Sequence, residues 1–155
     1  MTGRVLIAGI GNIFLGDDAF GSEAARRLMR EPWPENVRVA DFGIRCFDLT
    51  FALLDGYDTV ILLDATQRGG PPGTLYTIEP VLGEGESGEP ETHGMNPMRV
   101  LALAKSMGAA WKRLLVVGCE PDPQSVDPEG EGALGLSEAV RPALETTVEV
   151  VRRLI

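Results

Sequence analysis

The chain has 155 residues, 44% of them hydrophobic, which predicts one globular domain with a buried core over residues 1–155. Its formal net charge is −9, and it has no basic run, so a nucleic-acid partner is excluded because phosphate backbones are repelled. No apolar run approaches the roughly 18 residues of a membrane span, and the N-terminal one is too short for a signal peptide. We therefore expect a cytoplasmic protein without a membrane partner.

The first 30 residues predict a buried strand, a turn and a helix. Residues 5–8 are apolar, as in a strand that is buried on both faces of a parallel sheet. A glycine turn at 9–12 follows, then the adjacent acids Asp17 and Asp18, and then helical spacing of apolar residues over 21–30. This order places two carboxylates at the carboxyl end of a strand, where open α/β sheets build their sites. A purely structural alternative is that both acids complement the dipole of the helix.

Strands and helices alternate along the rest of the chain. Apolar runs predict strands at 37–40, 59–63, 75–78 (antiparallel or at an edge) and 114–117, and helices are expected at 47–54, 97–108 and 137–155. Asn96 and Ser137 are placed to cap the last two helices. The alternation predicts an α/β fold, a single-domain three-layer sandwich with a mainly parallel sheet of about five strands flanked by helices.

Two acids at strand ends and the only histidine form the candidate site. Asp64 directly follows the strand at 59–63, as Asp18 follows the first strand, so adjacent parallel strands would bring both to one edge of the sheet. His93 stands between an acidic, glycine-rich segment and the helix that begins after Asn96. Two carboxylates and one imidazole suit a borderline divalent ion that also touches a substrate. Asp18, Asp64 and His93 are therefore the candidate catalytic and metal-binding residues.

Other site chemistries have weaker support in the sequence. A G-x-G turn and Asp41 suggest dinucleotide binding, but the third glycine of that fingerprint falls on Phe14, and the acid pair would repel a pyrophosphate. The sequence lacks the G-x-S-x-G turn that would carry the nucleophile of a serine hydrolase. Cys119 with His93 forms a possible nucleophile pair, although a cysteine at the end of an apolar strand is more often packed and inert.

Four short stretches, which span nearly the whole chain, carry a family resemblance. They are Gly9-Ile10-Gly11-Asn12 through Gly16-Asp17-Asp18-Ala19-Phe20-Gly21, Asp64-Ala65 with Gly69-Gly70-Pro71-Pro72-Gly73, Thr92-His93-Gly94, and Val117-Gly118-Cys119-Glu120-Pro121 with Leu136-Ser137. With them the chain resembles the nickel–iron hydrogenase maturation endopeptidases, which remove the C-terminal extension of a hydrogenase large subunit after nickel insertion.

The resemblance implies an endopeptidase in which Asp18, Asp64 and His93 take the places of the family's nickel-sensing ligands. It also implies that nickel arrives in the substrate, the large-subunit precursor, so that no permanently bound metal and no other cofactor is expected. We expect the protein to be a monomer. Nickel bound to two oxygens and one imidazole would keep coordination positions for ligands from the precursor.

The sequence departs from the family pattern after the second expected strand. The family commonly has a glycine-rich D-G-G-T-x-G turn there, whereas residues 41–47 read DFGIRCF, which makes a bulkier turn. This departure keeps open a non-catalytic alternative, a nickel-checking chaperone or binding module for a hydrogenase-like subunit. A second alternative, a small nucleotide-binding domain, rests on Gly9, Gly11 and Asp41.

Overall fold

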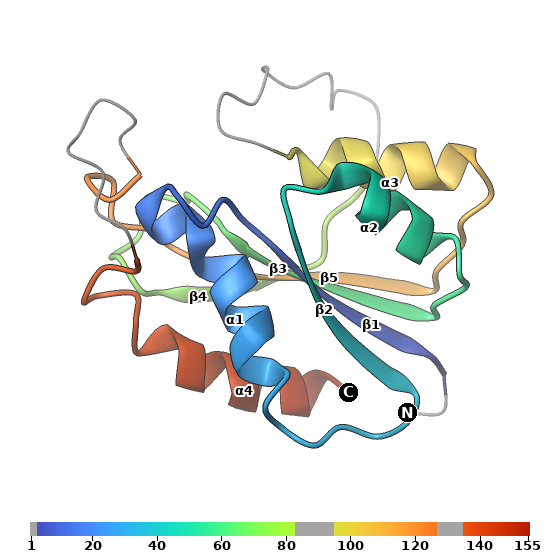
Figure 1. The fold of residues 1–155 in the computed structure, drawn as a ribbon, viewed down its shortest axis with the longest axis horizontal. Helices are drawn as coiled ribbons and strands as arrows, with labels where there is room; N and C mark the ends of the chain where they lie inside the picture. The colour runs from blue at the N-terminus through green and yellow to red at the C-terminus, as the bar shows by residue number, and fades with distance from the viewer. Residues whose placement is uncertain (1–2, 83–94, 127–134) are drawn as a thin grey trace.

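The computed structural model describes residues 3–82, 95–126 and 135–155, which form a five-stranded sheet with helices on both faces (Figure 1). The elements in chain order are β1 (Val5–Ile10), the short 3-10 helix η1 (Gly16–Ala19), α1 (Phe20–Leu28), β2 (Val37–Gly43), α2 (Cys46–Leu53), β3 (Thr59–Ala65), β4 (Leu75–Ile78), α3 (Pro97–Ser106), β5 (Arg113–Cys119) and α4 (Ala143–Leu154). The strand order is β2-β1-β3-β5-β4, and only β4 pairs antiparallel, at one edge. The predicted α/β sandwich is confirmed.

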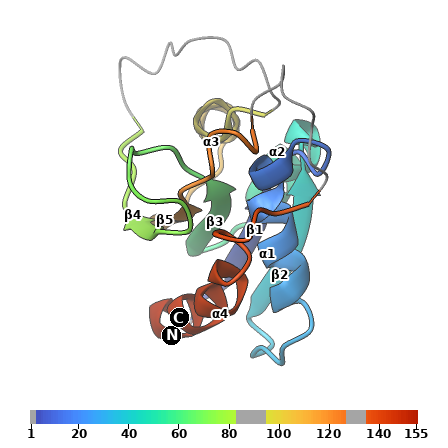
Figure 2. The ribbon, with the colours of Figure 1, turned by 90° about the vertical axis from the view of Figure 1, so that its left-hand side faces the viewer.

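Each face of the sheet is covered by a pair of helices (Figures 1 and 2). α1 and α4 pack on one face, against side chains of β1 such as Val5 and Ile7, while α2 and α3 pack on the other face, against Leu6 and Ala8. All six residues of β1 are buried, as expected for a central parallel strand between two helical layers. The long apolar runs in the sequence thus reflect burial from both sides.

Glycines allow close packing at the carboxyl ends of β1 and β3. A Cβ atom on Gly9 would lie 2.3 Å from the carbonyl oxygen of Gly21, and one on Gly11 would lie 2.3 Å from that of Asp18. A Cβ atom on Gly21 would lie 2.0 Å from the carbonyl oxygen of Ile10 and 2.1 Å from that of Leu63. The first turn of α1 is therefore in direct contact with both strand ends, and η1 is held beside them.

The two predicted helix caps have different outcomes. Asn96 caps α3 as predicted, since its side-chain oxygen accepts a hydrogen bond of 3.0 Å from the backbone N–H of Met98. The prediction for Ser137 is wrong, because α4 begins only at Ala143, after Pro142. The backbone N–H and the hydroxyl of Ser137 instead both donate to the buried carboxylate of Asp17. A buried carboxylate requires such hydrogen-bond donors, because it has lost its contact with water.

In the three described parts of the chain, every helix is too short or too polar to cross a membrane.

Candidate functional site

Asp18 and Asp64 line one small pocket, of about 90 Å³, at the carboxyl edge of the sheet. Asp64 belongs to β3 and Asp18 to η1, which follows the neighbouring parallel strand β1. Pro97, the first residue of α3, and Met95, just before the helix, also line this pocket. The predicted meeting of the two acids is confirmed. His93, the third predicted residue, lies outside the described residues.

Backbone donors hold both carboxylates at the pocket wall. The N–H of Asn12 donates to Oδ2 of Asp18 over 3.1 Å, and the N–H of Ala65 donates to Oδ1 of Asp64 over 2.9 Å. Both side chains are partly exposed. Both carboxylates lie at the carboxyl edge of the sheet in a fixed orientation. Two oxygen atoms held in this way could bind a cation that approaches from solvent.

A complete metal site is not formed by the described residues alone. Over residues 3–82, 95–126 and 135–155, no three His, Cys, Asp or Glu side chains gather in a way that could hold an ion. The described residues therefore bring two carboxylates, of Asp18 and Asp64, to this pocket. The catalytic and metal-binding roles of Asp18, Asp64 and His93 stay predictions.

Asp17, the neighbour of Asp18 in sequence, has a structural role that the sequence did not reveal. Its side chain is fully buried, and its carboxylate accepts hydrogen bonds from the backbone N–H (2.7 Å) and hydroxyl (2.7 Å) of Ser137 and from the N–H of Asp122 (2.9 Å). Its own N–H donates to the hydroxyl of Ser125 over 2.7 Å. Successive side chains of a 3-10 helix point about 120° apart, so η1 turns one acid inward and the next toward the pocket.

Glu120 fixes the chain that follows β3. Its buried carboxylate accepts hydrogen bonds from the Tyr76 hydroxyl (2.7 Å) and from the backbone N–H groups of Arg68 (2.8 Å) and Gly70 (3.0 Å). The Tyr76 hydrogen bond lowers the pKa of Glu120, and the two backbone donors act in the same direction. Glu120 thus stays ionised and anchors the turn that leads away from Asp64.

Cys119 lacks the chemistry of a nucleophile. The side chain is buried at the end of β5, and burial raises the pKa of the thiol to about 12, with a further contribution from the nearby carboxylates of Asp17 and Glu120. The reactive form of cysteine is the thiolate, which is scarce at neutral pH when the pKa is this high. The cysteine-nucleophile alternative is therefore not supported.

We expect an alkylating reagent at pH 8 to modify Cys46, which is partly exposed, and to leave Cys119 unmodified in the folded protein. Cys119→Ala should retain the endopeptidase activity that the family resemblance implies. Peptide mass mapping after timed labelling measures both sites, and labelling in urea provides the fully reactive control. Complete loss of activity upon alkylation of Cys119 in the native state would contradict this view.

The glycine turn packs closely against the chain that follows it. Gly9 and Gly11 are needed there because the carbonyl oxygens of Gly21 and Asp18 occupy the positions where their Cβ atoms would lie. Asp41, the proposed ribose ligand, is instead paired with Arg26 (Oδ2 to Nε, 2.9 Å). Both features on which nucleotide binding rested therefore have a structural explanation.

The chain is similar to hydrogenase maturation proteins in sequence and in fold. A family model described as hydrogenase maturation protease matches residues 23–154. The chain is 30% identical over 159 residues to the hydrogenase expression/formation protein HupD of Rhodobacter capsulatus, covering 96% of this chain and 75% of that protein. It is 27% identical to a putative hydrogenase maturation protease of Methanocaldococcus jannaschii, covering 95% of this chain and 93% of that protein.

Two solved structures show the same architecture. The hydrogenase maturating endopeptidase HybD from E. coli superposes with a TM-score of 0.77 at 26% identity, over 96% of this chain and 89% of that chain. The [NiFe] hydrogenase maturation protease HycI from Thermococcus kodakarensis superposes with a TM-score of 0.74 at 27% identity, over 97% of this chain and 90% of that chain. Because the family model covers most of the chain and the folds agree over nearly their whole length, the chain belongs to the hydrogenase maturation protease family.

Proposed function

We propose that this protein is an endopeptidase that removes the C-terminal extension of a nickel–iron hydrogenase large-subunit precursor after nickel insertion. We propose further that Asp18, Asp64 and His93 recognise the nickel that the precursor carries. The family membership supports the reaction. The observation that supports the site is the meeting of Asp18 and Asp64 in one pocket at the carboxyl edge of the sheet.

The donor set explains how an ion in the substrate would act as a signal. Two carboxylate oxygens and one imidazole bind nickel only moderately, and they leave coordination positions for ligands that the precursor already supplies. A nickel ion at this edge would connect the two proteins and polarise a nearby peptide carbonyl for attack by water. A precursor with an empty metal site lacks that connection and is expected to be ignored.

We propose a monomer that acts in the cytoplasm on the precursor, with no nucleic-acid partner and no membrane partner. The net charge of −9 supports the exclusion of nucleic acid, because phosphate backbones are repelled by an acidic surface. Sedimentation of the protein alone and with the precursor measures the proposed monomer and the complex.

The decisive experiment compares nickel-loaded and nickel-free precursor, incubated side by side with the wild-type protein. We expect the C-terminal fragment to be released only from the loaded form, with the matching loss of mass from the large subunit. Equal cleavage of both forms would contradict nickel recognition. Nickel-dependent binding without any cleavage would instead support the non-catalytic chaperone.

A further inference from the structure

A second pocket, of about 290 Å³, lies beside the carboxylate pocket. The two pockets share three lining residues, Gly11, Asn12 and Ile44. Phe14, on the turn before η1, lines only the second one. We call this second pocket the Phe14–Ile44 pocket. A substrate segment that reaches Asp18 and Asp64 therefore passes directly beside it.

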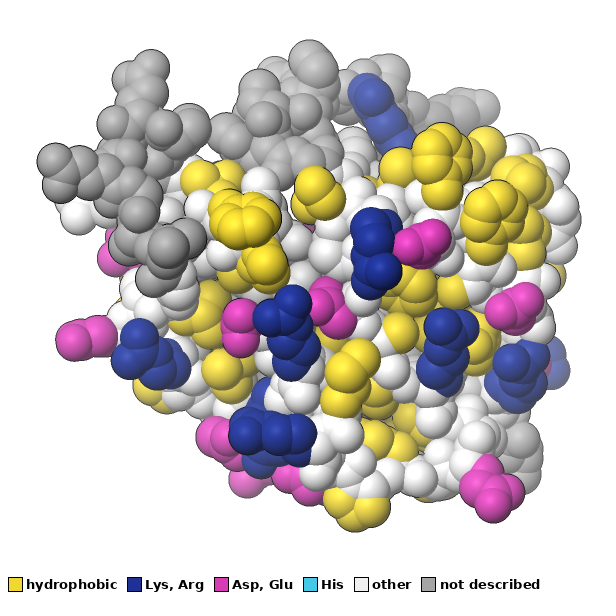
Figure 3. Space-filling view, viewed as in Figure 1, with side chains coloured by type: hydrophobic (Ala, Val, Ile, Leu, Met, Phe, Trp, Pro, Cys, Tyr) yellow, Lys and Arg dark blue, Asp and Glu magenta, His cyan; other side chains and the backbone are white. Residues whose placement is uncertain are grey.

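Large hydrophobic side chains are exposed at this pocket. Phe14 is 75% exposed and Ile44 is 52% exposed. Phe47 and Phe51 of α2 are also exposed, and Figure 3 shows several separate groups of hydrophobic side chains on the surface. Phe14 and Ile44 line one pocket together, and exposed apolar side chains that gather in this way mark surfaces that bind a partner.

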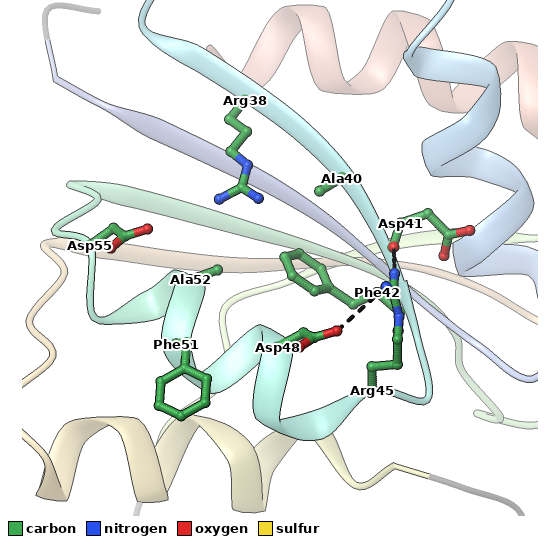
Figure 4. A pocket seen from close by; sticks show the side chains of 9 residues that line it. All are labelled: Arg38, Ala40, Asp41, Phe42, Arg45, Asp48, Phe51, Ala52 and Asp55. Atoms are coloured by element: carbon green, nitrogen blue, oxygen red, sulfur yellow. Dashed lines mark hydrogen bonds and ion pairs between the residues drawn. The ribbon is translucent and has the colours of Figure 1, made fainter.

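The charged side chains that line the Phe14–Ile44 pocket already bind one another or the backbone. Asp41 pairs with Arg26 and also accepts a hydrogen bond from the N–H of Gly43 over 3.0 Å. Arg45 donates from Nε to the carbonyl oxygen of Phe42 over 3.1 Å and pairs with Asp48 over 3.4 Å (Figure 4). The rest of the lining is mostly apolar and includes Ile13 and Phe42, which favours an uncharged apolar group over a charged one.

Asn12 links the Phe14–Ile44 pocket to the carboxylate pocket. Its side-chain oxygen accepts a hydrogen bond of 2.9 Å from the N–H of Phe14, while its own N–H donates to Asp18. Asn12 thus holds both Phe14, in the apolar pocket, and the carboxylate of Asp18, in the other pocket. A substrate held in both pockets would be fixed in register with respect to Asp18.

We propose that the Phe14–Ile44 pocket receives an uncharged, apolar side chain of the precursor, from chain close to the segment that carries the metal. Phe14 and Ile44 are then specificity-determining residues, which select the precursor and set its register, while the carboxylate pocket reads the ion. This inference rests on the proposed function, because the occupant is the same substrate. It assigns a binding role to the bulky turn at residues 41–47.

The test measures processing of nickel-loaded precursor by variants of the pocket wall. We expect Phe14→Ala and Ile44→Ser each to raise KM about tenfold, as loss of a central apolar contact does at an interface, with kcat changed less than about twofold. Ile44→Val should restore a near-normal KM. Met29→Ala is the matched control, because Met29 is also an exposed apolar residue but follows the far end of α1 and lines neither pocket.

The outcomes separate this inference from the proposed function. If wild-type protein distinguishes loaded from empty precursor, but both pocket variants keep a normal KM, the Phe14–Ile44 pocket is not a substrate site and the proposed function stands. If wild-type protein cleaves both precursors equally and the variants still raise KM, nickel recognition fails and the pocket stands. Urea unfolding of each variant shows whether the fold is intact, and Phe14→Ala carries the test alone if Ile44→Ser unfolds.

Discussion

Replacement of either pocket carboxylate by its amide is expected to stop processing of the nickel-loaded precursor while the protein stays folded. Asp18→Asn and Asp64→Asn keep the shape of the side chain but remove the negative charge, and a neutral amide is a much weaker ligand for a divalent ion. We expect the rate to fall more than about 100-fold in each variant, because loss of even an outer-shell partner of a metal ligand costs about 10- to 100-fold. Release of the C-terminal fragment, followed by mass spectrometry, gives the rate.

His93→Ala is expected to have the same effect, since two ligands hold an ion poorly. The matched control is Asp55→Asn, which removes an exposed carboxylate from a different pocket, between β2 and α2 (Figure 4). It should retain activity within about twofold of wild type, as expected for a surface change away from the site. Full activity in Asp18→Asn, Asp64→Asn or His93→Ala would overturn the assignment of ligands even though the family membership holds.

Gly21→Ala is expected to destabilise the protein by about 3 kcal/mol or more, the upper end of the cost of overpacking. The added Cβ atom would lie 2.0 Å and 2.1 Å from two backbone carbonyl oxygens, of Ile10 and Leu63, neither of which is at the end of a flexible side chain. α1 must therefore move away from β1 and β3. Urea unfolding monitored by circular dichroism gives the change in the free energy of unfolding.

Gly108→Ala provides the comparison for that variant. Gly108 has φ of +106° and open space around the position of a Cβ atom, so alanine there meets backbone strain without a steric clash. Its expected cost is about 1 kcal/mol. A cost for Gly21→Ala no larger than that for Gly108→Ala would contradict the close packing of α1 on the strand ends.

The fold could be predicted from sequence because its strands carry strong local signals. The runs at 5–8 and 60–63 consist of apolar residues, as expected for strands that are buried on both faces, and both lie in central strands of the sheet. The antiparallel edge strand β4 was also expected. The start of α4 was missed, because Ser137 binds a carboxylate 120 residues away, and no local pattern reveals that partner.

The site was predictable where it depends on sheet topology and hidden where it depends on side-chain direction. Adjacent parallel strands bring residues that follow them to one edge, which is why Asp18 and Asp64 were expected to meet. The sequence could not tell the buried Asp17 from Asp18, since that difference comes from the turn of η1. The donors to Glu120 come from residues 44 to 52 positions away, so its role could be seen only in the folded chain.

Asp17 also holds together two segments of the chain, one before and one after residues 127–134. Its carboxylate binds Asp122 on one side of that stretch and Ser137 on the other, so both sides are fastened to one point. One buried carboxylate thus fixes two segments that lie far apart in sequence from η1, directly beside the acid that lines the carboxylate pocket.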